Sequence, residues 1–309
     1  MINKIVAIQG NDPKKLNPIS DTSIFLANEA QNRKYKIFYY EPKDLSIIND
    51  TVIAKGFFIK FDYLNKQFFK IQKQYKLNLL NCKFILIRQD PPFNLEYIST
   101  TYMLDKIKNK VQIINNPTSI RNISEKLYSS TYQKFMPKTI FTKDLKEIKK
   151  FYKKNKKIII KPIHGFGGND IHLLEGSYKN RLVINFIRKH GYIMCQKFLP
   201  NIRNGDKRVF LINGKICGAI SRIPKKGSFL SNMSKGATPI LTKLTTKEKK
   251  ISSILAKDLK KKNIYLAGID FIDEKLNGDI NITSPTGLKT YYDLSKIDLA
   301  KVFWKGLKA

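Results

Sequence analysis

Cysteine and histidine are scarce in this chain. Its 309 residues include three cysteines, Cys82, Cys195 and Cys217, which lie far apart and form no C-x-x-C pair. The three histidines show no metal-ligand spacing. Few, unpaired cysteines are typical of a protein in a reducing compartment, so we expect a cytoplasmic location. The same scarcity argues against disulfides and against a zinc site.

Long apolar runs are also missing. No stretch approaches the roughly 20 apolar residues that a membrane-spanning helix needs. The segment Lys4–Ile8 reads as a short strand rather than as the hydrophobic region of a signal peptide. The sequence therefore predicts no membrane association.

Arginine is rare although the chain is strongly basic. Only 8 of the 58 Lys and Arg residues are arginine, and the formal net charge is +34. Recognition of nucleic acids favours the planar fork of arginine, whereas the lysines here are scattered along the chain. We therefore expect a weak, salt-sensitive affinity for polyanions and no specific nucleic-acid partner.

The pattern of elements predicts two architectures in series. A hydrophobic content of 42%, with 19 Phe and 15 Tyr, excludes a disordered chain. In the first third, strands alternate with helices, which implies a parallel sheet flanked by helices. After Ser119 we expect a helix and then strands broken by lysine-rich helices. The expected strands are 4–9, 36–40, 84–88, 111–114, 157–160, 170–174, 206–212, 215–221 and 266–272. The first expected helix is capped near Ser20 or Asp21, and the others span 95–108, 120–132, 147–154, 179–189 and 245–262.

A polar pair near the C-terminus indicates a metal site. In the segment Asp279-Ile280-Asn281-Ile282, alternation in a strand places Asp279 and Asn281 on one face and buries the isoleucines on the other. Asp270, in the preceding apolar run, supplies a further carboxylate. Oxygen ligands of this kind suit Mg²⁺ or Mn²⁺ bound together with nucleotide phosphates. The alternative is a strand edge with polar residues entering a turn.

A glycine-rich loop follows a lysine-terminated strand. Lys161-Pro162 leads into Gly165, Gly167 and Gly168, which would present a cation and free backbone N–H groups to a phosphate. The loop is neither a Walker A motif nor a Rossmann fingerprint, because a strand and not a helix follows it. The alternative is a glycine hairpin between two strands.

Several further polar positions continue this series. An apolar strand runs through Gln196 and Lys197 into Phe198-Leu199-Pro200, and its backbone could read an adenine edge. Asp206 and Arg208 then share one strand face. Each of these signals is weak, but their order along the chain, beginning with Lys126 and including Arg222, is specific.

This order resembles the ATP-grasp superfamily of carboxylate–amine ligases, and within it the bacterial glutathione synthetases, over nearly the whole chain. Arg88-Gln89-Asp90-Pro91-Pro92-Phe93 is similar to that family's RKDPPF segment, and Asn122–Leu127 to its NEKL helix. Lys161–Gly168 is similar to its KPLDGMGG loop. Asp206-Lys207-Arg208, Arg222-Ile223-Pro224 and Asn281–Gly287 also match.

The resemblance implies a fold, a reaction and a set of site residues. The fold is an N-terminal pre-ATP-grasp domain (residues 1–120) followed by an ATP-grasp domain (121–309), with a lid sub-domain at about 133–200 and a mobile loop at 223–238. The reaction joins glycine to γ-glutamylcysteine through an acyl-phosphate, releasing ADP and phosphate. Such chemistry needs positioning and positive charge rather than a nucleophilic side chain. A homo-oligomer is also implied.

The implied roles fall into four groups. Arg208 and Arg222 would be catalytic and Asp270, Asp279 and Asn281 would bind Mg²⁺. The ATP-binding residues would be Lys126, Lys161, Gly165, Gly167, Gly168, Gln196, Lys197, Phe198, Leu199 and Asp206. The peptide or amine would contact Asp90, Pro91, Pro92, Phe93, Ser284, Pro285, Thr286, Gly287 and Lys289.

The chain departs from the family pattern at some of these positions. Asp279 stands where the family usually has glutamate, with one extra residue before it. Leu230 and Thr238 replace arginines of the mobile loop, and Lys289-Thr290 replaces Arg-Glu. These changes predict weaker loop closure and leave open an ATP-grasp ligase with a different peptide or amino-acid substrate. A lysine-rich nucleic-acid-binding protein that keeps the fold without catalysis is the third alternative.

Overall fold

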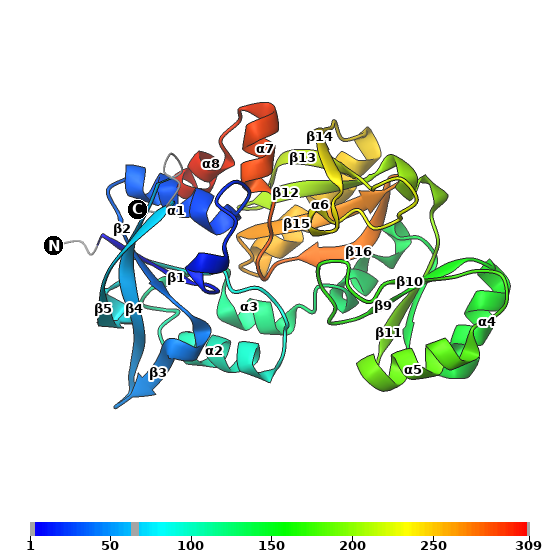
Figure 1. Ribbon diagram of the computed structural model, residues 1–309, viewed down its shortest axis with the longest axis horizontal. Coiled ribbons are helices and arrows are strands. Elements are labelled where there is room, and N and C mark those ends of the chain that lie inside the picture. The colour runs from blue at the N-terminus through cyan, green and yellow to red at the C-terminus, as the bar shows by residue number, and fades with distance from the viewer. Residues whose placement is uncertain (1–3, 63–67, 308–309) are drawn as a thin grey trace.

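The computed structural model describes residues 4–62 and 68–307. Three sheets follow one another along the long axis of the molecule (Figure 1). The sheet of the N-terminal third lies at one end, a five-stranded sheet lies in the middle, and a four-stranded sheet lies at the other end. Within the described residues no helix has both the length and the apolar composition to cross a bilayer.

The N-terminal sheet has a parallel centre and an antiparallel extension. Its order is β3-β4-β2-β1-β6-β7, with β5 paired to β4. The pairs of β1 with β2, β1 with β6 and β6 with β7 are parallel, as the alternation of elements predicted, whereas β3, β4 and β5 are antiparallel additions. The strands are β1 Ile5–Gln9, β2 Lys36–Tyr40, β3 Leu45–Ile48, β4 Thr51–Phe61, β5 Phe69–Asn78, β6 Phe84–Ile87 and β7 Gln112–Ile114.

Helices α1 (Thr22–Asn32) and α2 (Leu95–Asp105) pack on this sheet. The Asp21 carboxylate caps α1 by accepting from the Ile24 N–H at 2.9 Å, which satisfies one of the free donors at the helix start. Helix α2 is capped in the same way by Asn94. The predicted starts of these two helices are therefore confirmed, with Asp21 rather than Ser20 as the cap of α1.

The four-stranded sheet, in the order β10-β9-β11-β8, carries two amphipathic helices. In α4 (Leu145–Asn155), Ile148 and Tyr152 lie one turn apart and are buried, while the lysines between them face solvent. Helix α5 (Asn180–His190) buries Val183 and Phe186 in the same cluster. The strands are β8 Thr139–Thr142, β9 Ile158–Pro162, β10 His172–Leu174 and β11 Ile193–Lys197.

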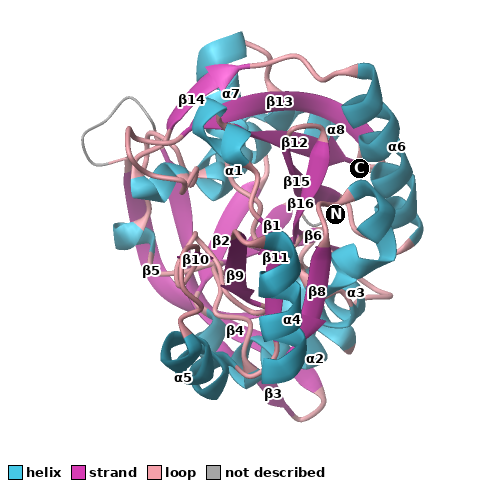
Figure 2. Ribbon diagram, turned by 90° about the vertical axis from the view of Figure 1, so that its right-hand side faces the viewer, coloured by secondary structure: helices cyan, strands magenta, loops and turns pink. Residues whose placement is uncertain are grey.

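The central sheet is antiparallel, in the order β14-β13-β12-β15-β16. Strands β12 and β13 form the predicted hairpin, and Asn213 and Gly214 at its turn have φ values of +49° and +74°, as a type I′ turn requires. Helix α6 (Thr246–Lys261) begins with a capping box and packs on β12 and β13 (Figure 2). The strands are β12 Asp206–Ile212, β13 Lys215–Ile223, β14 Thr238–Leu241, β15 Leu266–Ile272 and β16 Lys275–Asn281.

The predicted helix over 120–132 is wrong. Helix α3 spans Pro117–Asn122, and a 3-10 segment follows at Leu127–Phe135. Between them the chain is tied to β16, because the Glu125 carbonyl accepts from the Ile280 N–H at 3.1 Å and the Glu125 carboxylate accepts from the Ile282 N–H at 2.7 Å. These tertiary hydrogen bonds replace the helical ones, and they place Lys126 outside an α-helix.

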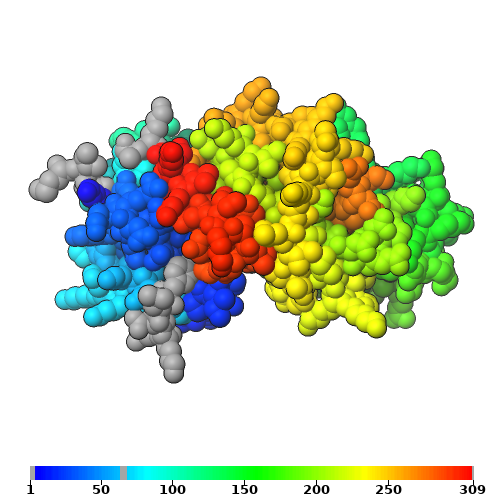
Figure 3. All heavy atoms as spheres, turned by 90° about the horizontal axis from the view of Figure 1, so that it is seen from above, coloured from blue at the N-terminus to red at the C-terminus, as the bar shows by residue number. Residues whose placement is uncertain are grey.

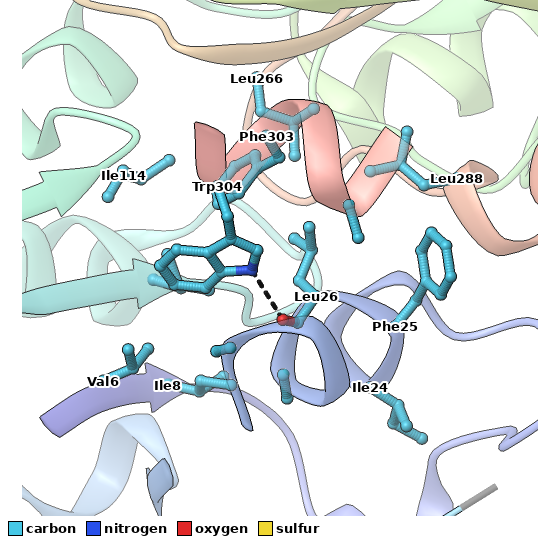
Figure 4. Close-up of a cluster of buried hydrophobic side chains, with 14 of the residues drawn as sticks. Val6, Ile8, Ile24, Phe25, Leu26, Ile114, Leu266, Leu288, Phe303 and Trp304 are labelled. Carbon is cyan, nitrogen blue, oxygen red and sulfur yellow. Dashed lines mark hydrogen bonds between the residues drawn. The ribbon is translucent and has the colours of Figure 1, made fainter. Parts of the chain in front are cut away.

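The C-terminal helices connect the central sheet back to the N-terminal one. Helices α7 (Leu288–Ser295) and α8 (Leu299–Lys305) pack against α1, and Figure 3 shows this segment between the N-terminal third and the central part. The Trp304 indole donates to the Leu26 carbonyl at 2.8 Å within a cluster that includes Val6, Ile24 and Phe303 (Figure 4). This shared core holds two of the parts that border the cleft described next.

Candidate active site

One cleft of about 770 Å³ collects the polar residues that the sequence singled out. It lies between the four-stranded and central sheets and is bordered by residues of the N-terminal third. The predicted residues that line it are Asp90, Pro91, Lys126, Lys161, Gly165, Gly167, Gly168, Gln196, Lys197, Phe198, Leu199, Asp206, Arg208, Arg222, Asp270, Asp279, Asn281, Ser284, Pro285 and Thr286.

Two lysines meet one carboxylate at the centre of the cleft. Lys126 Nζ lies 3.3 Å from Asp279 Oδ1, and Lys161 Nζ lies 3.5 Å from Asp279 Oδ2. Lys126 also donates to the Gly165 carbonyl. Burial alone would raise the pKa of Asp279, but the two ammonium groups outweigh it and hold the pKa at about 2. Asp279 is therefore ionised at neutral pH, and two cations converge on one point.

The glycine loop lies directly under the segment 223–238. Gly167 and Gly168 have φ values of +63° and +76°, a conformation that side chains with a Cβ disfavour. A Cβ on Gly168 would lie 2.3 Å from Asn232 Oδ1. Asn232 of the segment 223–238 can therefore lie this close to the glycine loop only because residue 168 has no side chain. Loop residues 229–235 line the cleft, and Ser231 hydrogen-bonds the Asp206 side chain. The segment covers the cleft in this structure.

The end of β11 and the residues after it, 196–199, line the cleft. The N–H of Lys197 donates to the Lys138 carbonyl at 2.8 Å, and that of Phe198 donates to the Lys157 carbonyl at 3.1 Å. Within residues 4–62 and 68–307, the Leu199 N–H has no hydrogen-bond partner, although it borders the cleft. The Phe198 ring lies between Lys157, 4.6 Å away, and Phe229 of the covering loop. An acceptor atom on the edge of a planar ligand can therefore accept a hydrogen bond from the Leu199 N–H.

Two arginines and two aspartates form a buried ion-pair network. Arg208 donates to both oxygens of Asp270, with a 2.8 Å bond from Nη2. Arg222 donates to both oxygens of Asp206 and also reaches Asp270 Oδ2 at 3.0 Å. Burial raises the pKa of Asp206 despite its arginine partner, whereas Arg208 and Arg222 outweigh burial and lower the pKa of Asp270. The network keeps four charged groups at fixed positions.

The oxygen donors fit a hard divalent cation. A carboxylate has about four lone-pair positions. Asp270 uses three of them for arginine donors, and Asp279 uses two for lysine donors. The Asn281 amide donates to the Gly268 carbonyl at 3.1 Å, which leaves its oxygen open. Each residue of the predicted set therefore lines the cleft and retains an unused oxygen lone pair, as Mg²⁺ ligation requires.

Four of the predicted substrate residues lie outside the cleft lining. Phe93 packs on Tyr97 in the N-terminal part, with ring centroids 5.1 Å apart, and Pro92 precedes it. Gly287, at φ +108°, forms the turn before α7. Lys289 forms an ion pair with Asp293 one helical turn away. Phe93 and Lys289 therefore have structural partners, and Gly287 has a structural role in the turn.

Sequence reasoning missed other residues of the site. Glu125 accepts from the Thr283 N–H and hydroxyl, both at 2.9 Å, and so fixes the chain after β16. Asn277 accepts from Lys161, as described below. Asp21 caps α1 and also lines the cleft. Only Glu125 carried a signal, because it lies inside the segment Asn122–Leu127 that matched a family motif.

The arrangement of the sheets around the cleft is the ATP-grasp fold. A D-cycloserine synthetase, DcsG, superposes with a TM-score of 0.67 at 11% identity, covering 98% of this chain and 100% of its own. The ATP-grasp ligase PsnB, in complex with a minimal precursor, Mg and ADP, superposes with a TM-score of 0.61 at 12% identity, covering 98% of both chains. At such low identity these structures show the shared fold alone.

Sequence comparison gives the family. The family models "Prokaryotic glutathione synthetase, N-terminal domain" and "Prokaryotic glutathione synthetase, ATP-grasp domain" match residues 5–121 and 125–296. The glutathione synthetase of Brucella melitensis is 33% identical over 98% of this chain and 98% of its own. That of Buchnera aphidicola subsp. Baizongia pistaciae is 36% identical over 96% and 94%. The chain belongs to the prokaryotic glutathione synthetase family, whose members are ATP-dependent ligases.

Proposed function

We propose that this protein joins glycine to γ-glutamylcysteine in an ATP-dependent reaction and forms glutathione. The substrate carboxylate attacks the γ-phosphate of ATP and forms an acyl-phosphate with release of ADP. The glycine amine then displaces phosphate and the peptide bond forms. The convergence of Lys126 and Lys161 at Asp279, beside a glycine loop, carries this proposal, because the geometry suits a polyphosphate.

ATP binds between the two sheets in this proposal. Lys126, Lys161 and the N–H groups of the glycine loop hold the phosphates. The Leu199 N–H supplies the open donor for the adenine edge, next to the Phe198 ring. The Asp206 carboxylate accepts hydrogen bonds from Arg222 and Ser231, and its remaining lone pairs accept from the ribose hydroxyls.

Arg208 and Arg222 stabilise the anionic acyl-phosphate and the tetrahedral species that follows it. Their guanidinium groups are already fixed by aspartates, so little reorganisation accompanies the reaction. Asp90, Pro91 and the segment Ser284–Thr286 border the other end of the cleft and hold the peptide substrate. Excluding water there protects the acyl-phosphate from hydrolysis.

Asp270, Asp279 and Asn281 would hold Mg²⁺ or Mn²⁺, which neutralises phosphate charge when bound. Six carboxylates and six cations line the cleft, so the side chains themselves supply no excess of negative charge. The nucleotide phosphates would supply that charge, and we expect the metal to bind together with them.

The domain organisation belongs to the same proposal. Residues 1–120 form the pre-ATP-grasp domain and 121–309 the ATP-grasp domain, with a lid at about 133–200 and a mobile loop at 223–238. We further propose a cytoplasmic homo-oligomer. Gel filtration with light scattering tests the assembly.

Phosphate release tests the reaction. With ATP, Mg²⁺ and γ-glutamylcysteine, we expect release to depend on glycine and to match glutathione formed, as measured by mass spectrometry. A panel of other dipeptides and amines tests whether the replacements Leu230, Thr238 and Lys289 have changed the substrate. Release without amine dependence, or with another dipeptide alone, would refute the proposed substrates.

Turnover should depend on a divalent cation through Asp279. We expect EDTA to abolish turnover and Asp279→Asn to raise the metal concentration for half-maximal activity about tenfold, because the carboxylate is a charged ligand. Asp273→Asn, in the exposed turn before β16, is the matched control. Normal turnover after EDTA, or equal metal dependence in both variants, would contradict the assignment.

We expect the loop 223–238 to close weakly, so that some ATP is hydrolysed without formation of a peptide bond. Leu230 lines the cleft, whereas Thr238 lies at the start of β14. We expect Leu230→Arg combined with Thr238→Arg to lower the ratio of ATP hydrolysed to peptide bonds formed. The added positive charges would bind an anionic ligand and keep the loop closed over it. Leu241→Arg adds one charge on an exposed position of the same strand and serves as control. A ratio near one to one in the unmodified protein, unchanged by the double substitution, would show that the replacements are neutral.

A further inference from the structure

Strand β16 carries an insertion opposite one of the proposed metal ligands. Its pairing with β15 is regular at Ile269–Ile280 and again at Phe271–Leu276, so three residues, Asn277 to Asp279, lie opposite Asp270 alone. Such a bulge re-aims side chains at the point where it interrupts the ladder. This bulge lies inside the cleft.

The bulge adds one polar residue to the cleft face. Two surplus residues preserve the alternation of faces along the strand, whereas a single one would reverse it. Leu276, Gly278 and Ile280 are accordingly buried on one side, and Asn277 joins Asp279 and Asn281 on the other.

Gly278 allows the bulge to form. Its φ is +90°, and a Cβ there would lie 2.4 Å from Met194 Cε and 3.0 Å from Met136 Cε. Met194 belongs to β11, so the back of the bulge packs against the four-stranded sheet. A residue with a Cβ is strained at this φ and crowds the two methionine methyl groups, so we expect it to change the bulge and move Asn277.

Asn277 accepts two hydrogen bonds from the Lys161 ammonium, and Asp279 lies beside it as a counter-ion. The Lys161 ammonium lies 3.1 Å from Asn277 Oδ1, 3.2 Å from the Asn277 carbonyl oxygen and 3.5 Å from Asp279 Oδ2. An ammonium group has three protons, and the lysine is 4% exposed. The two bonds to Asn277 fix the direction of the ammonium and leave one proton for a phosphate, whereas the ion pair with Asp279 alone would leave the group free to rotate.

We propose that Asn277 is a positioning residue. The bulge places both of its oxygens against Lys161, and they direct the lysine ammonium toward the phosphate site. This inference rests on the proposed function, because it assumes that Lys161 meets ATP. The side-chain oxygen orients the lysine before ATP binds, which lowers the ordering cost of binding. Asn277 contacts no reacting atom and acts through Lys161.

The test separates positioning from a structural role. We expect Asn277→Ala to raise the KM for ATP about three- to tenfold, as for loss of one hydrogen bond, with kcat within about twofold. Asn277→Gln, which keeps an amide oxygen, should recover part of the affinity. Gly278→Ala should raise the KM for ATP at least as much, because it displaces both oxygens of Asn277. Asn155→Ala, a half-buried asparagine at the end of α4, is the control and should leave KM unchanged.

Binding of a non-hydrolysable ATP analogue by calorimetry repeats the test without turnover. A weaker Kd in Asn277→Ala, with an unchanged Tm, supports the inference even if the proposed substrates prove wrong. An unchanged KM and Kd would overturn it. A fall in kcat with unchanged KM would also overturn it, because that result indicates a loss of folded protein.

Discussion

Replacing Lys161 or Lys126 by alanine is expected to lower kcat/KM for ATP about ten- to a hundredfold. Each side chain is nearly buried, and each would lose a charge-assisted contact with a phosphate, worth roughly 1.5–3 kcal/mol. The fold should survive either change, because Asp279 keeps the other lysine as its partner. Steady-state turnover at low and saturating ATP measures the effect.

The shared carboxylate makes a further prediction about the pair. Because both lysines contact Asp279, the double variant should depart from additivity in a double-mutant cycle. Lys153→Ala, on the solvent face of α4, removes the same charge far from the cleft and is the control. Unchanged turnover in both single variants would remove the lysines from the phosphate site.

Replacing Arg222 by methionine is expected to cost both activity and about 3–5 kcal/mol of folding stability. Asp206 is 1% exposed and pairs with Arg222 through both oxygens, so the substitution leaves a buried carboxylate without its cation. Asp270 loses one contact but keeps Arg208. Urea unfolding measures the stability, and phosphate release measures the activity.

The pH dependence identifies the cause of this loss. Burial already raises the pKa of Asp206, and removal of Arg222 should raise it further. A carboxyl group with a raised pKa in the folded state destabilises the protein where it must be ionised. The deficit should therefore shrink as pH falls and grow as pH rises toward neutrality. Adding Asp206→Asn should recover much of the stability and none of the activity. A deficit that is independent of pH and unaffected by Asp206→Asn would mean that lost packing, not charge, is responsible.

Much of the site was predictable because its signals are local. Glycines at 165, 167 and 168, a lysine at the end of a strand, and alternation through Asp279 and Asn281 each follow from a few adjacent residues. The hairpin at Asn213-Gly214 and the capped start of α1 are local in the same sense. Their chemistry depends on backbone geometry that neighbours in sequence determine.

Other features were not predictable from local pattern. The segment 120–132 reads as helical, but Glu125 exchanges helical hydrogen bonds for bonds to β16, which lies more than 150 residues away. Strand β5 is mostly exposed and polar, so only its pairing with β4 identifies it. In both cases a distant partner decides the local structure.

The sequence by itself determined the family, the alternation of the parallel strands with helices in the first third, and the charged residues that form ion pairs at the centre of the cleft. Only the tertiary structure decided how they pair: that Lys126 and Lys161 share Asp279, that Arg208 and Arg222 are tied to Asp270 and Asp206, and that Asn277 joins them. The physical reason is that ion pairs and bulge geometry depend on distances between separate strands. Side-chain alternation assigns a residue to a face, but the packing of two sheets determines what that face meets.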